Sequence, residues 1–501
     1  MRSVCNINRA ARTASLARRS AWLALTVLVL TGCGRDRPEQ LAAGRQQPPN
    51  IILITLESLR ADHVGCYGYE RNTTPALDAL SEQAVTFENA YAVTSWTLPS
   101  HASIFTGLYT LAHKVVAHDH KLDDSYVTLA ERLRDAGYQT AGFVAGPFLR
   151  TNHNLHQGFE IYDDSIANPD GNQAAHADIT NPPIEKRLAD FLTQKRSTER
   201  PFFLFAYLWD PHYDYIPPAP YDKTFVPADA ETIDVRGYEE KNIVTKNVSP
   251  GQLAYVISQY DGEILCTDMV LGRLWNRLHQ LDLWENTAIL VTADHGEEFF
   301  EHGSKGHKKN LYVESLHVPL IAKWPGPAKT QRDARLVSLI DLFPTVLELA
   351  DVTPTQPHQG RSLLQPPPAT PRPAFFELQA SWFVTNNLTR ETKMMTDLWF
   401  AVRYGNHKLV TVVNKNIWEL YDVARDPGEQ QPLGPEHNET LDSLRAMLKN
   451  HDTRTRHLAA NWGQAKPARL SPEDLRRLES LGYVKRAAPD AQKSQTTQPA
   501  P

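Results

Sequence analysis

The chain has 501 residues, and 41% of them are hydrophobic, which is enough to bury a large core and predicts one big domain with a smaller one. Its 58 acidic and 52 basic side chains give a formal net charge of −6. This balance gives no support to nucleic acid as a partner, and we expect none.

Residues 1–32 have the pattern of an export signal. Five arginines between positions 2 and 19 precede a short apolar run, Ala21 to Leu30, which is too short for a stable membrane span. The ending Leu30-Thr31-Gly32-Cys33 resembles the lipobox of bacterial lipoproteins, which implies a lipidated Cys33 as the mature N-terminus. We expect an exported protein, lipid-anchored on the cell-envelope side of a bacterial membrane, with residues 33–49 as a flexible tether. An uncleaved N-terminal anchor is the alternative.

The body of the chain alternates between two patterns. Continuous apolar runs at 50–56, 139–145, 201–209 and 287–293 predict strands that are buried on both faces. Segments 75–86, 128–136 and 259–279 have the apolar spacing of helices. The alternation predicts an α/β sandwich with a largely parallel central sheet. Further on, strands at 400–413 and 418–423 and a helix at about 438–451 predict a small sheet, and Ser471 is the expected cap of a last short helix.

Polar side chains follow three of the predicted strands. Glu57 follows the first, Asp210 and His212 follow the strand at 201–209, and Asp294 and His295 follow the strand at 287–293. Sites in open parallel sheets form beyond the carboxyl ends of the strands. Glu57, Asp294 and His295 are suitable ligands for one divalent cation, Mg, Mn, Ca or Zn. The alternative is that these residues only cap helices or form turns.

The segment Thr97-Leu98-Pro99-Ser100-His101 places a hydroxyl just before a helix that starts with proline. Its ordinary role is the N-cap of a helix beginning at Leu98 or Pro99. A hydroxyl in that position also lies among free N–H groups that favour an anion, and a cation would lower its pKa. Together with the predicted cation ligands, Thr97 indicates an enzyme that attacks a phosphate or sulfate ester. The sequence does not identify the ester.

Two cysteines remain after the signal and the lipidation site, Cys66 and Cys266. They could pair in an oxidising compartment, but their apolar contexts favour two buried thiols.

Several motifs resemble the sulfatase family of the alkaline phosphatase superfamily. They include Thr-Leu-Glu-Ser-Leu-Arg-Ala-Asp-His at 55–63, Pro-Ser-His-Ala-Ser-Ile-Phe-Thr-Gly at 99–107, Asp-His-Gly-Glu-Glu-Phe at 294–299 and Glu-Leu-Tyr-Asp-Val-Ala-Arg-Asp-Pro-Gly-Glu at 419–429. The resemblance runs from about Asn50 to Tyr483. It implies an alkaline-phosphatase-like sandwich, with a catalytic domain at 50–375 and a C-terminal α+β subdomain at 376–485. Residues 486–501 have the composition of a disordered tail.

The chain departs from the sulfatase pattern at three places. Sulfatases have a Cys or Ser, converted to formylglycine, where this chain has Thr97, and an Arg where it has His101. They also have two adjacent Asp where it has Glu57 and Ser58. Threonine is a secondary alcohol and is not a substrate for that conversion, so we expect no formylglycine. The remaining set is similar to that of phosphoglycerol and phosphoethanolamine transferases of the superfamily, which form a covalent phospho-threonine enzyme.

The resemblance also implies roles for residues around the predicted cation. His212 is the first choice for the general acid and His307 the second. Lys308 matches a lysine that holds a nonbridging oxygen, although Lys309 competes and the run could simply be solvated. The role of His101 is open. His118 or His120 could replace a family histidine, while Glu298, Glu301 and His302 could serve only to shape their loop.

The leading hypothesis is a metal-dependent hydrolase or transferase that acts on phosphate or phosphodiester esters through a covalent Thr97 intermediate. The alternatives are a sulfatase without formylglycine and a catalytically silent, lipid-anchored binding protein. The expected partner is an anionic ester, and an envelope glycan or a lipid headgroup would fit the expected location.

Overall fold

The computed structural model describes residues 48–167, 180–238, 244–385, 392–480 and 483. The predicted signal peptide, Cys33, nearly all of the tether and the tail at 486–501 lie outside the described residues. Among the described residues, no helix combines the length and the apolar character needed to cross a membrane.

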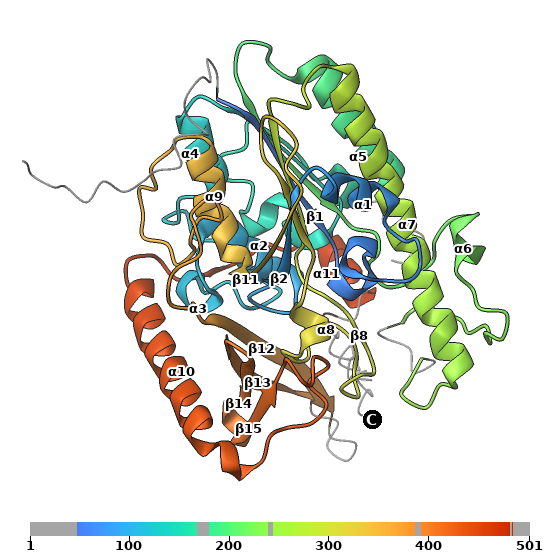
Figure 1. Cartoon of the computed structure of the whole chain (residues 1–501), viewed down its shortest axis with the longest axis vertical. Helices are drawn as coiled ribbons and strands as arrows, with labels where there is room; N and C mark the ends of the chain where they lie inside the picture. The colour runs from blue at the N-terminus through green and yellow to red at the C-terminus, as the bar shows by residue number, and fades with distance from the viewer. Residues whose placement is uncertain (1–47, 168–179, 239–243, 386–391, 481–482, 484–501) are drawn as a thin grey trace, which may run out of the picture. The chain divides into compact units, whose positions relative to one another are not determined.

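An eight-stranded sheet forms the centre of the fold, in the order β11-β2-β10-β7-β1-β6-β4-β5 (Figure 1). Within it, β10 is antiparallel to β7 and β2, and the other neighbouring strands are parallel. This confirms the predicted α/β class with a largely parallel sheet. The strands are β1 (Asn50–Leu56), β2 (Val85–Tyr91), β4 (Gln139–Val144), β5 (Ile161–Asp163), β6 (Phe202–Leu208), β7 (Thr287–Ala293), β10 (Leu320–Lys323) and β11 (Gln331–Ser338).

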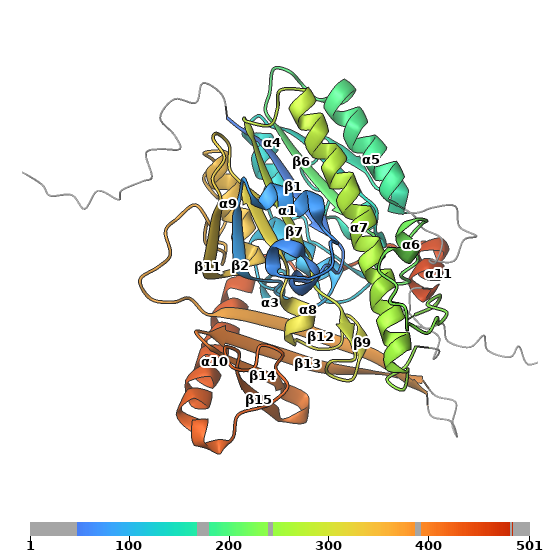
Figure 2. The ribbon, with the colours of Figure 1, turned by 45° about the vertical axis from the view of Figure 1, so that its right-hand side comes forward.

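Helices cover both faces of this sheet, and every residue of β1, β6 and β7 is buried. On one face lie α1 (Pro75–Ser81), α5 (Asn181–Asp190) and α7 (Pro250–Gln280), and on the other lie α2 (Thr97–Thr106), α4 (Leu129–Asp135) and α9 (Leu342–Leu349) (Figure 2). Burial of each large aliphatic side chain of β1 contributes about 1.5–3 kcal/mol. The continuous apolar runs that predicted these strands therefore also hold the layers together.

Three predicted helices have different bounds in the structure. The segment 75–86 divides into α1 and the start of β2, because Val85 and Thr86 pair with β10 and β11. The long helix begins at Pro250 rather than Gln259, because Ser249 and Gln252 form a capping box that the prediction overlooked. The helix predicted at 438–451 continues to Ala459.

A second sheet follows the large one in sequence, with the predicted helix beside it. The predicted strand at 400–413 divides at a turn at 405–406 into parts of two strands, and the strand predicted at 418–423 is present. The four strands of this sheet are antiparallel neighbours, and α10 (Asn438–Ala459) packs on them. The last helix, α11 (Pro472–Ser480), begins after Ser471, whose hydroxyl accepts the Asp474 N–H at 3.1 Å, as predicted. The domain boundary between 375 and 376 stays a prediction. The strands are β12 (Ala374–Thr385), β13 (Thr392–Tyr404), β14 (His407–Val412) and β15 (Ile417–Asp422).

Short elements connect these layers. They are α3 (Thr110–His113), α6 (Tyr221–Thr224), α8 (Val313–Leu316), β3 (His120–Lys121), β8 (Glu298–Phe299), β9 (Lys305–Gly306) and β16 (Lys466–Pro467).

Cys66 and Cys266 are both free thiols, the first half-buried and the second buried, in keeping with the favoured expectation.

Candidate active site

The carboxyl ends of three adjacent strands deliver the predicted cation ligands to one place. Because β1 lies between β6 and β7, the residues that follow β1 and β7 are neighbours. His295 Nε2 is 3.0 Å from Glu57 Oε1 and 3.5 Å from Asp294 Oδ2. All three side chains have no solvent exposure. The strand-end pattern thus predicted a real cluster.

Thr97 faces the same cluster and does not have the ordinary role of an N-cap. It is the first helical residue of α2, and Trp96 occupies the N-cap position without a side-chain cap. The Thr97 hydroxyl is 3.2 Å from Glu57 Oε2 and 3.4 Å from His295 Nε2. Since this hydroxyl is directed at charged groups and not at its own helix, it is placed to act chemically.

The residues of the cluster fit a divalent cation. Ligand atoms of Glu57, Asp294 and His295 lie within 4.8 Å of one another. Asp294 Oδ2 is buried without a hydrogen-bond partner, and a buried charge in that situation needs compensation. Burial and the neighbouring Glu57 carboxylate raise the pKa of Asp294. Burial opposes the His295 imidazolium, but Asp294 and Glu57 outweigh it and raise the pKa of His295 to about 10. Two carboxylates that share one imidazole are a donor set suited to a cation.

Two hydroxyl groups to which the sequence analysis assigned no role fix the Glu57 carboxylate. The Tyr207 hydroxyl donates to Glu57 Oε2, and the Ser58 hydroxyl donates to Oε1 at 2.8 Å. Ser58 has a positive φ of 53°, and this strained conformation brings its N–H to Asp294 Oδ1 at 3.2 Å. The only sequence signal for Tyr207 is a hydroxyl-bearing residue near the end of an otherwise apolar strand.

His101 links the first turn of α2 to strand β1. Its Nδ1 is 2.9 Å from the Thr97 carbonyl oxygen, and its Nε2 is 2.9 Å from the Thr55 hydroxyl of β1. Burial lowers the pKa of His101 to about 4, so its ring is neutral at pH 7. Both ring nitrogens are engaged away from the Thr97 hydroxyl, so this histidine ties the helix to the strand.

The two predicted acid histidines lie together beside the cation ligands. One ligand atom each of Glu57, His212 and His307 also lie within 4.8 Å of one another. The His212 ring stacks on Trp209 at 3.9 Å, and the rings of His212 and His307 are 5.3 Å apart. Burial lowers the pKa of His212 to about 3 and that of His307 well below its usual value.

Other residues orient this histidine pair or turn away from it. His307 Nδ1 is 3.3 Å from both oxygens of the buried Glu297 carboxylate, which the sequence analysis overlooked although it lies in the Asp-His-Gly-Glu motif. Asp210 instead accepts the N–H groups of Thr180 and Asn181, both at 3.2 Å, so it holds the start of α5.

Of the two competing lysines, Lys308 lies next to Trp96, the residue before Thr97. Its ammonium lies over the ring of Trp96 at 4.2 Å, and burial lowers its pKa to about 8. Lys309 instead donates to the Lys305 carbonyl. Burial and then the charge of Lys308 lower the pKa of His118, whereas the His120 ring is held by the Val116 N–H of its own loop. Which of the two lysines and which of the two histidines act at the site stays a prediction.

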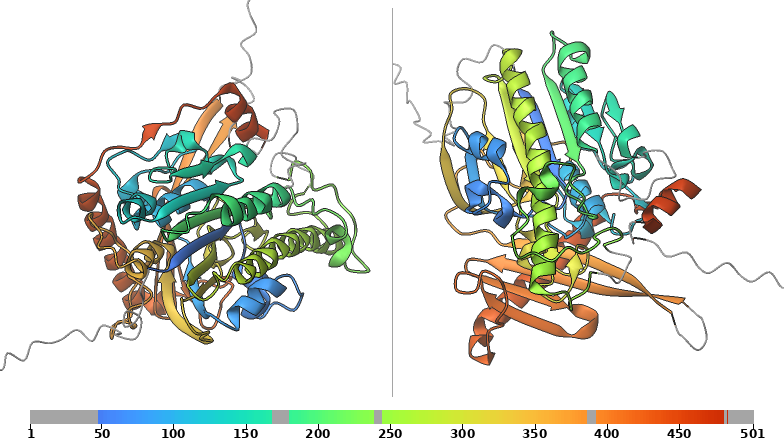
Figure 3. Two further views of the ribbon diagram at one scale, coloured as in Figure 1. Left: turned by 90° about the horizontal axis from the view of Figure 1, so that it is seen from above. Right: turned by 90° about the vertical axis from the view of Figure 1, so that its right-hand side faces the viewer.

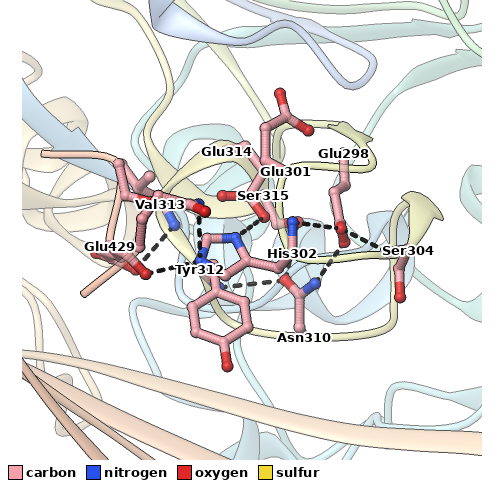
Figure 4. A network of polar contacts seen from close by, with 12 residues as sticks. Glu298, Glu301, His302, Ser304, Asn310, Tyr312, Val313, Glu314, Ser315 and Glu429 are labelled. Atoms are coloured by element: carbon pink, nitrogen blue, oxygen red, sulfur yellow. Dashed lines mark hydrogen bonds and ion pairs between the residues drawn. The ribbon is translucent and has the colours of Figure 1, made fainter. Parts of the chain in front are cut away.

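A buried polar network holds the loop that carries Glu297, His307 and Lys308 (Figure 4). The Glu298 carboxylate accepts the N–H groups of His302 and Ser304 and the Asn310 amide, at 3.0, 2.7 and 2.5 Å. His302 Nδ1 is 2.9 Å from Glu314 and its Nε2 is 2.8 Å from the Glu429 carbonyl oxygen. Glu301 pairs with Arg60 at 2.5 Å. These contacts agree with the expectation that Glu298, Glu301 and His302 shape the loop.

Comparisons with known proteins point to one family. The family model "Sulfatase" matches residues 49–352, and a model of the C-terminal region of N-sulphoglucosamine sulphohydrolase matches residues 301–456. Arylsulfatase K of Rattus norvegicus is 25% identical over 473 residues, which cover 85% of this chain and 82% of that protein. An N-acetylglucosamine-6-O-sulfatase of Bacteroides thetaiotaomicron is 23% identical, with 82% and 86% covered.

A solved structure has the same fold. The phosphonate monoester hydrolase of Agrobacterium radiobacter superposes with a TM-score of 0.65 at 21% identity, over 81% of this chain and 96% of that one. The family match extends over more than half of the sequence and includes the strand ends that carry the cluster. The chain thus belongs to the sulfatase family and is an ester hydrolase of the alkaline phosphatase superfamily.

Proposed function

We propose that this ester hydrolase transfers a phosphoryl group from a phosphate ester or phosphodiester through a covalent bond to Thr97, and passes it to water or to an acceptor alcohol. The observation that carries the proposal is the direction of the Thr97 hydroxyl, which points at Glu57 and His295 and caps no helix. Formation of a covalent intermediate divides one difficult displacement into two easier ones.

In this proposal, Glu57, Asp294, His295 and Thr97 hold one divalent cation, Mg, Mn or Ca, with Zn as a further option. The chemistry that such a cation supplies when bound is positive charge, which lowers the pKa of a hydroxyl and stabilises anionic oxygens. Tyr207 and Ser58 keep the Glu57 carboxylate in place. The Lys308 ammonium faces aromatic rings and is available for a nonbridging oxygen of the ester.

In the first step, Thr97 Oγ1 enters as the alkoxide, its proton having gone to solvent, and forms a bond to phosphorus while the bond to the leaving oxygen breaks. His212 or His307 gives that oxygen a proton from Nε2. Burial keeps both rings neutral in the free protein, so the acid must gain its proton as the anionic ester binds and supplies the missing counter-charge. Glu297 supports the imidazolium of His307.

In the second step, water or an acceptor hydroxyl attacks phosphorus and Thr97 Oγ1 leaves. The histidine that gave a proton in the first step now takes one from the attacking oxygen. A phospho-threonine can be displaced in this way. A threonine sulfate lacks the exit that a formylglycine hydrate has, because it cannot revert to an aldehyde, and this favours phosphorus over sulfur.

The nature of the alcohol is a separate part of the proposal. The relative named N-acetylglucosamine-6-O-sulfatase supports a glycan ester as the substrate class. The predicted lipid anchor on Cys33 would bring the enzyme to envelope glycans and lipid headgroups. Incorporation of labelled palmitate into the parent, and its loss in Cys33→Ser, would test the anchor.

Paired assays test the reaction. Purified protein would be given an aryl phosphate diester or an aryl sulfate with each cation in turn, and intact-protein mass spectrometry would follow each soak. We expect faster turnover of the phosphate diester and a phosphoryl adduct that is absent from Thr97→Val. Thr106→Val is the matched control, because Thr106 is equally buried on the same helix and bonds only the Ala102 carbonyl.

Two results would replace the proposal. Faster turnover of the aryl sulfate would support a sulfatase that works without formylglycine. If neither ester reacted with any cation and Thr97→Ala bound the ester as well as the parent, the protein would be a silent binding protein.

A further inference from the structure

Tyr483 reaches the histidine pair from the far end of the chain. Its hydroxyl oxygen is 2.7 Å from His307 Nε2 and 3.2 Å from His212 Nε2. The Tyr483 side chain is half-buried, whereas His212 and His307 are each only 4% exposed. The tyrosine therefore borders both the two imidazoles and solvent.

The position of this hydroxyl oxygen bears on the proposed transfer of a proton from the two histidines. The Nδ1 atom of His212 is engaged with the Tyr213 carbonyl, and that of His307 with the Glu297 carboxylate. Only the two Nε2 atoms remain to give a proton to a leaving oxygen, and both are directed at the tyrosine oxygen. A general acid must lie within hydrogen-bond distance of the oxygen that it protonates. The phenol, itself an alcohol, thus stands where a leaving alcohol would be.

The neighbours of the Tyr483 ring define the region in which this hydroxyl lies. The ring meets Phe148 edge-on with centroids 4.7 Å apart, and the Lys308 ammonium lies 5.2 Å from its centre. An aromatic edge and a cation are both favourable neighbours for a ring face. The region beside Phe148 and Lys308 therefore suits a hydroxyl group that is carried on a ring.

The tyrosine is delivered by an anchored helix. Its N–H donates to the Leu478 carbonyl of α11 at 2.8 Å, and Leu478 is buried. Asp474 forms an ion pair with Arg150, which follows β4 by a few residues. In Figure 3 the red helix α11 lies near the teal part of the chain. The contact of Tyr483 with the histidines thus has a docked element behind it.

We propose that Tyr483 occupies the subsite of the leaving alcohol, that this subsite takes an alcohol carried on a ring, and that such an alcohol must displace the tyrosine side chain to bind. The inference rests on the proposed function, because that function assigns His212 and His307 as the acids. It goes further by naming the class of leaving group and an internal competitor for it.

The test uses p-cresol, which is the side chain of tyrosine as a free molecule, with n-butanol as an alcohol without a ring. Calorimetry would measure the binding of each to the parent, Tyr483→Ala and Tyr483→Phe. We expect Tyr483→Ala to bind p-cresol at least tenfold more tightly than the parent and to show no such gain for n-butanol. Tyr483→Phe should bind p-cresol no better than the parent, because its ring still fills the subsite.

Kinetics provide a second readout. With the aryl phosphate diester, we expect Tyr483→Ala to have a KM at least threefold below that of the parent, and p-cresol to compete with the substrate. Tyr162→Ala is the control, since Tyr162 is a half-buried tyrosine whose hydroxyl donates to the Leu149 carbonyl. Thermal unfolding would verify that each variant is folded, and Tyr483→Phe remains informative if the alanine variant is not.

Two outcomes would overturn the inference. One is equal binding of p-cresol to the parent and Tyr483→Ala. The other is a Tyr483→Ala or Tyr483→Phe variant with reduced kcat and unchanged KM, which would make Tyr483 a positioning residue for the histidines. The calorimetry decides the question even if the parent turns over no ester. Conversely, an active Thr97→Val would refute the nucleophile alone and leave the subsite standing.

Discussion

The ion pair between Lys408 of β14 and Glu429 lies entirely inside the protein and connects the C-terminal sheet to the loop of the active site. Lys408 Nζ is 2.8 and 2.7 Å from the two oxygens of Glu429, and the two side chains are 0% and 1% exposed. Glu429 Oε2 also accepts the Val313 N–H at 3.1 Å. The Glu429 carbonyl oxygen is 2.8 Å from His302 Nε2, a contact that Figure 4 shows.

We expect Lys408→Met to lower the free energy of unfolding by about 3–5 kcal/mol, since it leaves a buried carboxylate without a counter-charge. The double variant Lys408→Met with Glu429→Gln should recover about half of that loss or more, because no charge then stays buried. The single variant should also reduce kcat, because the loop that bears His307 and Lys308 loses its support.

Urea unfolding of the parent, both single variants and the double variant would measure these differences. Lys415→Met is the matched control, in the connection between β14 and β15. Lys415 pairs with Asp397 at 2.6 Å, but its side chain is 47% exposed, so we expect a loss of at most about 1 kcal/mol. The reasoning fails if Lys408→Met costs no more than the control, or if the two single losses simply add in the double variant.

Three further predictions concern the site. A divalent cation at 100 times its Kd should stabilise the parent by about 2.7 kcal/mol, and Asp294→Asn should lose this gain at the same concentration; an equal thermal shift in both proteins would exclude Asp294 as a ligand. Glu297→Gln should lower kcat by up to about 10²-fold through His307, and an unchanged kcat would contradict this. Burial opposes the charge of His302, but Glu314 raises its pKa. The contribution of His302 to stability is therefore complete below about pH 6.5 and is lost as the pH rises through the folded pKa. Across that range the urea midpoint of His302→Gln should change less with pH than that of the parent. Parallel plots of midpoint against pH for the two proteins would contradict this.

Much of the site could be predicted from local patterns. A buried strand needs a continuous apolar run, so the runs at 50–56 and 287–293 could be recognised without any partner strand. The polar residue that ends each run then marks the edge at which sites form, which identified Glu57, Asp294 and His295. The helix predicted at 75–86 was wrong in part. Its last residues belong to β2, which depends on pairing with β10 and β11, and those two strands lie more than 200 residues further along the chain.

The buried strands β1, β6 and β7, the candidate cation ligands and the candidate nucleophile were predicted from the amino-acid sequence alone, because hydrophobic runs and the chemistry of side chains are local properties. Only the tertiary structure decided the direction of the Thr97 hydroxyl, the support of Glu57 by Tyr207, and the arrival of Tyr483 at His212 and His307. These contacts join residues that are 40 to 271 positions apart. No pattern along the chain encodes such a distance, because it depends on the order of the strands and on where the last helix docks.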